Sequence, residues 1–397
     1  MQPVIVQKYG GTSVSSPEKI IRICDQIAQA VAQGFGVVVV ISAMGEFTDQ
    51  LLALARSVHS RPPPRELDML LTAGERVSMS LLSMALAARE VPAVSFTGSQ
   101  SGILTDGRHG FAKICGIKAF RVREALSRGE VAIVAGYQGV CPQTKEVTTL
   151  GRGGSDLTAV AMAQHFQASK CEIYTDVEGV YSANPHEYTR AVLHRRINAE
   201  NAYDLSCAGA QVLYSRCVAF AIKYRVPICV RSSMSFDRPG TEIVYEEQSL
   251  EKAKLIGFTV LPHTYWLCIS GSPNTLAYCQ IEQQFCHQGG EKLFSSYAEV
   301  KGMGQLTMVL REGSLDLLQG LVAQAGLCIE TMNAQVPSLT VVGQGFEHDR
   351  ELVAQVLSCV DHHPIFYAVR DRRMLFVFAS PLVTEKVDRI HQLIQPD

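Results

Sequence analysis

The sequence predicts an α/β protein with a largely parallel sheet, followed by two smaller ferredoxin-like units. Residues 1–245 alternate short apolar runs with helical patterns, which is typical of parallel α/β domains. After a polar connector at residues 246–252, the expected order becomes strand, helix, strand, strand, helix, and this order occurs twice. A chain of 397 residues is also too long for one ordinary core.

In the first part, the apolar run at residues 4–6 predicts a buried strand over residues 4–8. Ser16 is expected to cap the next helix, with Pro17 at its first position and Gly34 at its end. The β-branched run at residues 36–42 predicts a strand buried on both faces. Further strands are expected at 93–96, 131–135, 171–175 and 226–231, and helices at 47–60, 66–88, 118–128, 156–166 and 215–224.

The second part is expected to contain two units of similar length. The first has predicted elements at 266–270, 274–287, 293–301, 305–310 and 314–325, and the second at 338–342, 349–361, 365–370, 374–379 and 381–394. The predicted domain boundaries are therefore 1–245, 255–330 and 336–397.

Composition excludes several classes of function. Hydrophobic content of 47% with 19% charged residues is typical of a globular protein, and a net charge of -2 argues against nucleic-acid or membrane-surface partners. We find neither a membrane-length apolar run nor a signal-peptide pattern. The twelve cysteines lack metal-ligand spacing, and His362 and His363 are expected in an exposed turn. We therefore predict reduced thiols, a cytoplasmic location and no protein-held metal.

The most informative motif follows the first strand, where Lys8, Gly10 and Gly11 occur in the segment VQKYGGTSV. Glycines at a strand end let the backbone approach a ligand, and their N–H groups can converge on phosphate oxygens. Lys8 adds a positive charge of the kind that stabilises phosphoryl transfer. The spacing is neither that of a P-loop nor that of a Rossmann fingerprint. An ordinary strand-to-helix turn is the alternative.

A second glycine-rich loop, LGRGGSD at residues 150–156, leads into an apolar helix. Ser155 or Asp156 is expected to cap this helix, whose N-terminus would suit an anion. Arg152 can hold a carboxylate through two parallel hydrogen bonds. The alternative is a solvated Arg152 beside an ordinary capped helix, and the presence of the first motif weighs against it.

These motifs and five further blocks resemble the aspartokinases of the amino acid kinase family. The blocks, in family order, are VVISAMG (39–45) with Thr48 and Asp49, LTAGER (71–76), TDGRHG (105–110), AGYQG (135–139) and YTDVEGVY (174–181). The resemblance implies a three-layer αβα amino-acid-kinase domain with a mainly parallel sheet. It also implies that the two C-terminal units are ACT domains, which bind regulatory amino acids and form a homodimer.

The resemblance further implies ATP-dependent phosphorylation of the β-carboxylate of L-aspartate, giving 4-phospho-L-aspartate, with Mg²⁺ carried mainly by the ATP phosphates. Lys8 would stabilise the γ-phosphoryl group and Asp156 would hold Lys8. The implied substrate-binding residues are Ser42, Thr48, Glu75, Arg152 and Ser155, and the implied nucleotide-binding residues are Gly10, Gly11, Thr12, Thr175, Asp176 and Tyr181. Arg152 would bind the α-carboxylate and Glu75 the ammonium. The alternatives are a solvated surface charge for Glu75 and a turn cap for Asp176.

Two departures from the family pattern remove positive charge expected near the ATP phosphates. His186 stands where the family has arginine, and Gln211 where it has lysine. Losing one such cation costs on the order of 1–3 kcal/mol of binding. Weaker ATP binding, another nucleotide and a reduced rate all remain open.

The regulatory segments also differ. Residues 341–346 keep the family's glycine-rich turn in part, and residues 369–375 replace its second effector segment. We therefore expect weak or altered inhibition by lysine or threonine. Two other functions remain open: a kinase of another amino acid carboxylate, and a catalytically silent ACT-bearing subunit. Gln211 and His186 favour the silent subunit, whereas Lys8, Glu75 and Arg152 oppose it.

Overall fold

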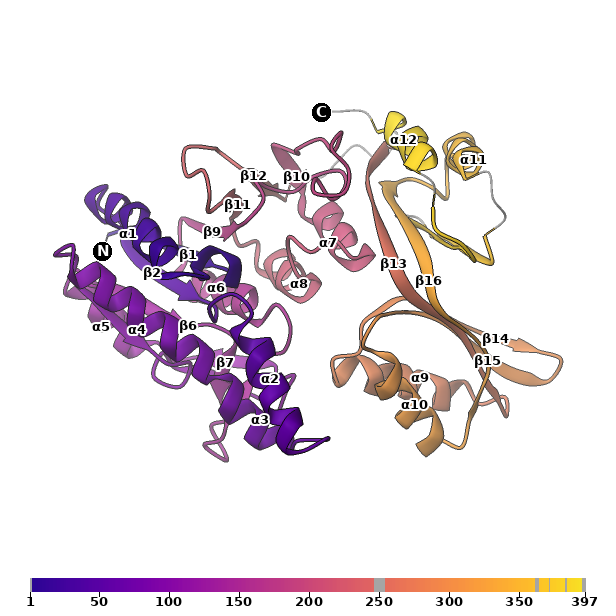
Figure 1. Ribbon diagram of the computed structural model, residues 1–397, viewed down its shortest axis with the longest axis horizontal. Helices are drawn as coiled ribbons and strands as arrows, with labels where there is room; N and C mark the ends of the chain where they lie inside the picture. Colours follow the sequence, from indigo (N-terminus) through magenta and orange to yellow (C-terminus); the bar gives the residue numbers. More distant parts are fainter. Residues whose placement is uncertain (1, 246–253, 361–363, 371, 383, 395–397) are drawn as a thin grey trace. The chain divides into compact units, whose positions relative to one another are not determined.

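The computed structural model describes residues 2–245, 254–360, 364–370, 372–382 and 384–394, and these form two compact units (Figure 1). The first unit comprises Met1–Val180, Leu193–Tyr203 and Val212–Glu246, and the second comprises Tyr181–Val192, Asp204–Gln211 and Glu247–Asp397. The predicted connector at 246–252 and the turn at His362 and His363 lie outside the described residues. The three predicted domain boundaries remain predictions.

An eight-stranded sheet lies at the centre of the first unit, in the order β10-β12-β11-β9-β1-β2-β6-β3. Its strands are β1 (Val4–Tyr9), β2 (Gly36–Ile41), β3 (Ala93–Phe96), β6 (Val131–Ala135), β9 (Lys170–Thr175), β10 (Arg196–Asn198), β11 (Ile228–Ser232) and β12 (Thr241–Val244). Neighbouring strands are parallel except β11 and β12. The mainly parallel sheet predicted from the sequence is confirmed.

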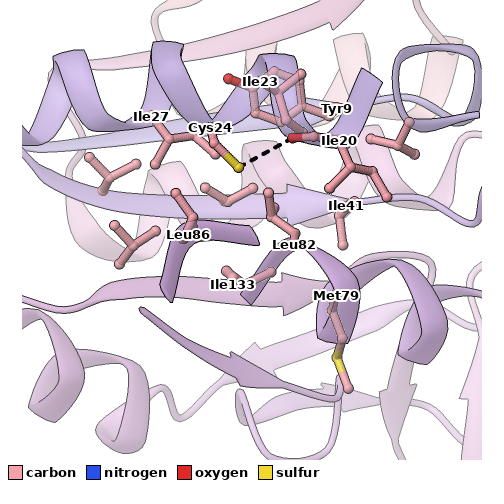
Figure 2. Close-up of a cluster of buried hydrophobic side chains, with 14 of the residues drawn as sticks. Tyr9, Ile20, Ile23, Cys24, Ile27, Ile41, Met79, Leu82, Leu86 and Ile133 are labelled. Carbon is pink, nitrogen blue, oxygen red and sulfur yellow. Dashed lines mark hydrogen bonds between the residues drawn. The ribbon is translucent and has the colours of Figure 1, made fainter. Parts of the chain in front are cut away.

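Helices cover both faces of this sheet, so the predicted three-layer arrangement is also confirmed. α1 (Pro17–Ala32) and α4 (Ala73–Ala87) pack on one face, and α5 (Phe120–Ser127), α6 (Gly154–Phe166) and α8 (Ser215–Tyr224) belong to the other. Figure 2 shows apolar side chains of α1 and α4 meeting over the sheet, including Ile23, Ile27, Leu82 and Leu86. As predicted, Ser16 caps α1 by accepting a hydrogen bond from the Lys19 N–H.

Side chains alternate across β1, and this alternation places its lysine. Ile5 and Tyr9 belong to the buried cluster beneath α1 and α4. Lys8 therefore points to the opposite face, where α6 lies. β1 is central in the sheet, so this side chain is held by a rigid element.

The first unit also contains a four-stranded sheet, β5-β4-β7-β8, that the sequence did not reveal. Its strands are β4 (Ile103–Thr105), β5 (Ile114–Ile117), β7 (Gln138–Val140) and β8 (Val147–Thr149); the shorter helices are η1 (Gly11–Val14), α2 (Phe47–Val58) and α3 (Pro64–Leu71). The single helix predicted at 66–88 is wrong, because α3 and α4 are separate and meet at Thr72. At the start of α4, Gly74 packs closely against the turn after β2, since a Cβ there would lie 2.7 Å from the Ala43 side chain.

The second unit contains a six-stranded sheet in the order β14-β15-β13-β16-β18-β17. Its elements are β13 (Lys254–Gly271), α9 (Thr275–His287), β14 (Lys292–Val300), β15 (Met303–Arg311), α10 (Leu315–Gln324), β16 (Cys328–Gln344), α11 (Arg350–Cys359), β17 (Phe366–Arg370), β18 (Arg373–Val377) and α12 (Thr384–Gln392). The twice-repeated order of elements is confirmed. α7 (Ala199–Ala208) includes residues of both compact units.

The two repeats share their long strands. Residues 264–271 of β13 pair with β15, whereas residues 254–261 pair with the end of β16 that also pairs with β18. Each repeat thus obtains its fourth strand from the other repeat's long strand. This sharing was not predicted, because it depends on pairing between segments far apart in the sequence.

Candidate active site

The carboxyl end of β1 lies where parallel α/β sheets bind ligands. The chain continues from β1 to β2 on one side and later adds β9 on the other side, which makes this edge a topological switch point. A cavity of about 220 Å³ opens here. It is lined by Lys8, Gly10, Gly11, Ser42, Ala43, Gly45, Thr48, Glu75, Tyr137, Arg152, Gly153, Gly154, Ser155, Asp156 and Tyr214.

An ion pair in this cavity joins the central strand to the helix on its other face. Lys8 Nζ lies 2.5 Å from Asp156 Oδ1, and the two side chains are 11% and 5% exposed. The prediction that Ser155 or Asp156 caps α6 is wrong, because the N-cap is Gly153, with a left-handed φ of +69° and no side-chain cap bond. Asp156 sits in the first turn, and its carboxylate pairs with Lys8 rather than with the helix backbone. The helix N-terminus therefore lines the cavity, where it favours an anion.

Glu75 supplies a buried acceptor to the same cavity. Its side chain lies in the first turn of α4, and the residue is 3% exposed. Oε1 accepts the Ala43 N–H at 3.2 Å, whereas Oε2 has no hydrogen-bond partner among the described residues. Burial raises the pKa of Glu75 to about 7. The alternative of a solvated surface charge is therefore wrong, and the group is suited to a cationic ligand.

The loop between β8 and α6 presents Arg152 to the cavity. Two glycines on either side of Arg152 have left-handed backbones, with φ of +76° at Gly151 and +69° at Gly153. A Cβ at Gly153 would lie 2.1 Å from the ring of Tyr214. Glycine is thus required for this backbone conformation and for its close packing. The cavity combines a guanidinium, an ammonium and two carboxylates.

The two glycines after β1 are fixed by close packing. A Cβ at Gly10 would lie 3.2 Å from Lys8 Nζ, and one at Gly11 would lie 3.0 Å from the Ala43 and Gly45 carbonyl oxygens. The Gly10 N–H makes a long 3.4 Å bond to the Tyr174 carbonyl, so it is not directed at the cavity. Thr12 lies in η1 and does not line the cavity.

The other predicted nucleotide-binding residues lie outside this cavity. Thr175 ends β9, the neighbour of β1, and its hydroxyl donates to the Asp176 carboxylate at 3.0 Å. The Thr175 carbonyl accepts the Ser233 N–H at 2.8 Å. Tyr181 belongs to the second compact unit, as do His186 and Gln211.

Tyr137 and Tyr214 also line the cavity, and neither was predicted as a site residue. Tyr137 follows β6 with a left-handed φ of +69°, which is rare for a bulky residue. Burial raises its pKa to about 12, so its hydroxyl stays protonated at neutral pH. The sequence feature that could have identified Tyr137 as a site residue is its position in the AGYQG block, directly after a predicted strand. Ser42, Thr48 and Ser155 line the cavity as predicted.

The described residues contain neither a metal-binding cluster nor a membrane-spanning helix. No cluster of three or more His, Cys, Asp or Glu side chains in these ranges could hold a metal ion. No helix there combines the length and apolar character needed to cross a membrane. All twelve cysteines are free thiols.

Comparison with known proteins defines the class of this protein. The model of the amino acid kinase family matches residues 3–232, which is more than half of the chain. The chain therefore belongs to the amino acid kinase family.

Within that family, the chain is similar to aspartokinases. It is 50% identical to the aspartokinase of Mycolicibacterium smegmatis over 256 residues, covering 64% of this chain and 61% of that one. It is 48% identical to the aspartokinase of Thermus thermophilus over 250 residues, covering 63% and 61%. The chain thus spans about 61% of the length of these curated relatives.

Solved structures show the same fold over nearly the whole chain. Escherichia coli aspartokinase III in complex with aspartate and ADP matches with a TM-score of 0.83 and 20% identity, covering 98% of this chain and 99% of that one. Synechocystis aspartate kinase matches with a TM-score of 0.56 and 29% identity, covering 99% and 70%. The α/β fold with its mainly parallel sheet is therefore that of aspartokinase structures.

Proposed function

We propose that the protein transfers the γ-phosphoryl group of ATP to the β-carboxylate of L-aspartate, forming 4-phospho-L-aspartate and ADP. This reaction would be the first step toward aspartate semialdehyde. The observation that carries the proposal is a single cavity that contains the Lys8–Asp156 pair, the buried acceptor Glu75 and Arg152. The similarity to aspartokinases supports the same function.

The charges of the cavity suit an α-amino acid with a second carboxylate. Arg152 binds the α-carboxylate, and the unpartnered Oε2 of Glu75 accepts from the ammonium. With both ends of the backbone held, the β-carboxylate is directed toward Lys8. Ser42, Thr48 and Ser155 add hydroxyl groups to the lining of the same cavity.

Transfer requires two anions to approach one another, so positive charge and N–H donors must offset their repulsion. An oxygen of the β-carboxylate attacks the γ-phosphorus while the bond to the leaving ADP oxygen breaks. Lys8 and the N-terminus of α6 stabilise the phosphoryl oxygens, and Asp156 holds Lys8 in place. Mg²⁺ enters with the ATP phosphates. Gly10 and Gly11 at the cavity wall, with Thr12, Thr175 and Asp176 outside the cavity in the same compact unit, bind the nucleotide.

The test is a hydroxamate assay with purified protein, Mg-ATP, L-aspartate and hydroxylamine, which traps acyl phosphates as a coloured product. We expect hydroxamate from the parent protein and none above background from Lys8→Ala. Activity with glutamate but not aspartate would assign another amino acid carboxylate. No hydroxamate from any amino acid, despite measurable aspartate binding, would favour the silent subunit.

We also propose that feedback control is weak or altered. The partly retained glycine-rich turn contains Phe346, which is buried, and a Cβ at Gly343 would lie 2.6 Å from its ring. In the replaced segment, Arg372 Nε lies 2.5 Å from the Asp204 carboxylate. A bulky ring and an internal ion pair thus occupy two segments that bind effectors in the family.

A homodimer through the ACT units is proposed on the exposed edge of β16. Within the described ranges, residues 328–335 pair with β13 alone, and Met332 in this stretch is 43% exposed. An unpaired strand edge readily pairs with another chain. Light scattering should give twice the chain mass for the parent protein, and Met332→Lys should shift the equilibrium toward monomer.

A further inference from the structure

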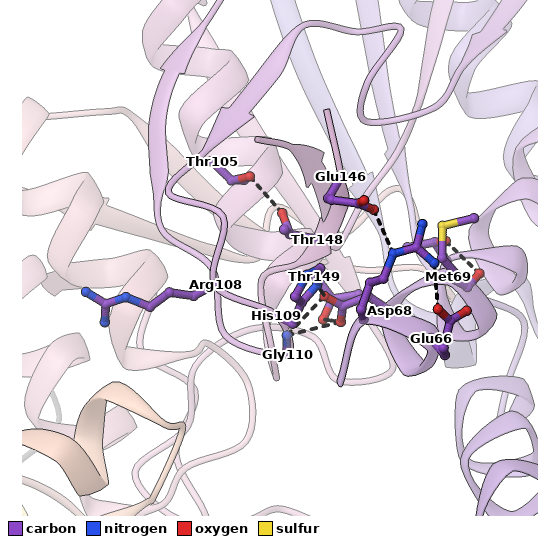
Figure 3. A network of polar contacts seen from close by, with 12 residues as sticks. Glu66, Asp68, Met69, Thr105, Arg108, His109, Gly110, Glu146, Thr148 and Thr149 are labelled. Carbon is purple, nitrogen blue, oxygen red and sulfur yellow. Dashed lines mark hydrogen bonds and ion pairs between the residues drawn. The ribbon is translucent and has the colours of Figure 1, made fainter. Parts of the chain in front are cut away.

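A buried carboxylate outside the cavity accepts several hydrogen bonds from segments distant in sequence (Figure 3). This group is Asp68 in α3, which is 1% exposed and does not line the cavity. Burying this carboxylate would cost free energy without hydrogen-bond donors. The structure supplies three such donors.

The donors come from β8 and from the loop that follows β4. The Thr149 hydroxyl donates to Asp68 Oδ1 at 2.6 Å, and the Gly110 N–H lies 3.1 Å from both carboxylate oxygens. His109 Nδ1 lies 2.7 Å from Oδ2. Figure 3 shows these groups converging on Asp68, while Arg108 points away from it.

Each partner is close in sequence to a substrate-binding residue. Thr149 ends β8, and Arg152 follows three residues later. Asp68 lies in α3, which meets α4 at Thr72, so Glu75 follows Asp68 by seven residues. The hydrogen bond from Thr149 to Asp68 therefore links the segment that carries Arg152 directly to the segment that carries Glu75.

The surrounding contacts make this link stiff. The Ala112 N–H donates to the Thr149 carbonyl at 2.8 Å. A Cβ at Gly151 would lie 2.4 Å from the Phe111 ring, and the Arg216 guanidinium stacks on that ring at 4.1 Å. The loop next to His109 and Gly110 is thus packed against the turn that presents Arg152.

We propose that Asp68 is a positioning residue that fixes the distance between Arg152 and Glu75, and thereby the affinity for the amino acid substrate. This inference rests on the proposed function. Asp68 touches neither substrate nor nucleotide and acts through Thr149 and α3. Its loss should therefore raise the KM for aspartate while leaving the KM for ATP and kcat nearly unchanged, since Lys8 and Asp156 are held by other elements.

The test compares variants that differ in one hydroxyl or one charge. Thr149→Val removes the hydroxyl at constant shape, and Thr149→Ser keeps it. We expect Thr149→Val and Asp68→Asn each to raise the KM for aspartate about tenfold, and Thr149→Ser less than about twofold. Glu66→Gln is the matched control on α3, because its ion pair with Arg65 is exposed, and it should leave all constants unchanged.

The outcomes separate the inference from the proposed function. A parent protein without aspartate-dependent hydroxamate would refute both. An active parent protein with an unchanged aspartate KM in Thr149→Val would refute the inference alone. The inference would also be refuted if kcat fell and the KM for ATP rose together with the KM for aspartate, because this would indicate a general structural role. Melting curves by circular dichroism identify any variant that fails to fold, and Thr149→Val, the milder change, then decides.

Discussion

Replacing Glu75 by glutamine should show separately how much stability the buried charge costs and how much that charge contributes to aspartate binding. Burial raises the pKa of Glu75 from 4.5 to about 7, so the folded protein holds this proton more tightly than the unfolded chain. Each tenfold change in proton affinity corresponds to about 1.4 kcal/mol, so keeping the carboxylate ionised above pH 7 costs about 3 kcal/mol.

The sign of the pH dependence follows from this raised pKa. Between pH 4.5 and 7 the folded state binds more protons than the unfolded state, so the Glu75 contribution to stability falls as pH rises through this window. Glu75→Gln lacks that dependence and can keep the bond from the Ala43 N–H. We expect the variant and the parent to have similar stability near pH 4.5. At pH 8 the variant should be more stable by about 2–3 kcal/mol.

The assay must follow the first compact unit. Trp266 is the single tryptophan and lies in the second unit, so its fluorescence serves as an internal reference. Hydrogen exchange of β2 peptides reports on the first unit and gives the free energy of opening at each pH. If the difference in opening free energy between the variant and the parent stays constant from pH 5 to 8, the raised pKa of Glu75 is refuted. Equal aspartate affinity in the variant and the parent at pH 8 would refute the role of Glu75 as ammonium acceptor.

Three further predictions concern the ion pair, the glycine turn and regulation. Lys8→Met should abolish turnover and destabilise the first unit by about 3 kcal/mol, because it leaves Asp156 buried and unpaired; adding Asp156→Asn should restore the unfolding midpoint in urea but not activity. Gly153→Ala should raise the KM for aspartate at least tenfold and lower the melting temperature, because a Cβ there meets the Tyr214 ring, and unchanged kinetics would contradict the assigned packing. Lysine or threonine at about 1 mM, a typical weak-binding concentration, should inhibit the hydroxamate reaction by less than half; strong inhibition by either would contradict the proposed loss of feedback.

Much of the fold could be predicted from the sequence because its main elements carry strong local patterns. β3, β6 and α8 have the predicted bounds, since each combines an apolar run with a clear turn at both ends. The strands of the small sheet were not predicted. They have three or four residues each, which is too short for a two-residue period to be recognised.

The site residues could be predicted where a charged residue lies within a short glycine-containing motif. Lys8, Glu75 and Arg152 were all identified and all line one cavity. The cap of α6 was wrong because a left-handed Gly153 replaces the usual side-chain cap, and the sequence does not reveal a backbone angle. Tyr214 was missed for a related reason, since its ring fills space left by that glycine. Asp68 acts through contacts that exist only in the folded chain.

The second compact unit takes in a segment from within the part of the chain that matches the amino acid kinase family, and this limits how the gene can be divided. Tyr188, in Tyr181–Val192, packs on Phe258, and its hydroxyl donates to Asp388 at 2.6 Å. A chain ended after residue 245 would expose this aromatic side chain, so we expect the shortened protein to aggregate. Exchange of the C-terminal part between homologues, by recombination or by engineering, would therefore have to carry residues 181–192 and 204–211 along with it.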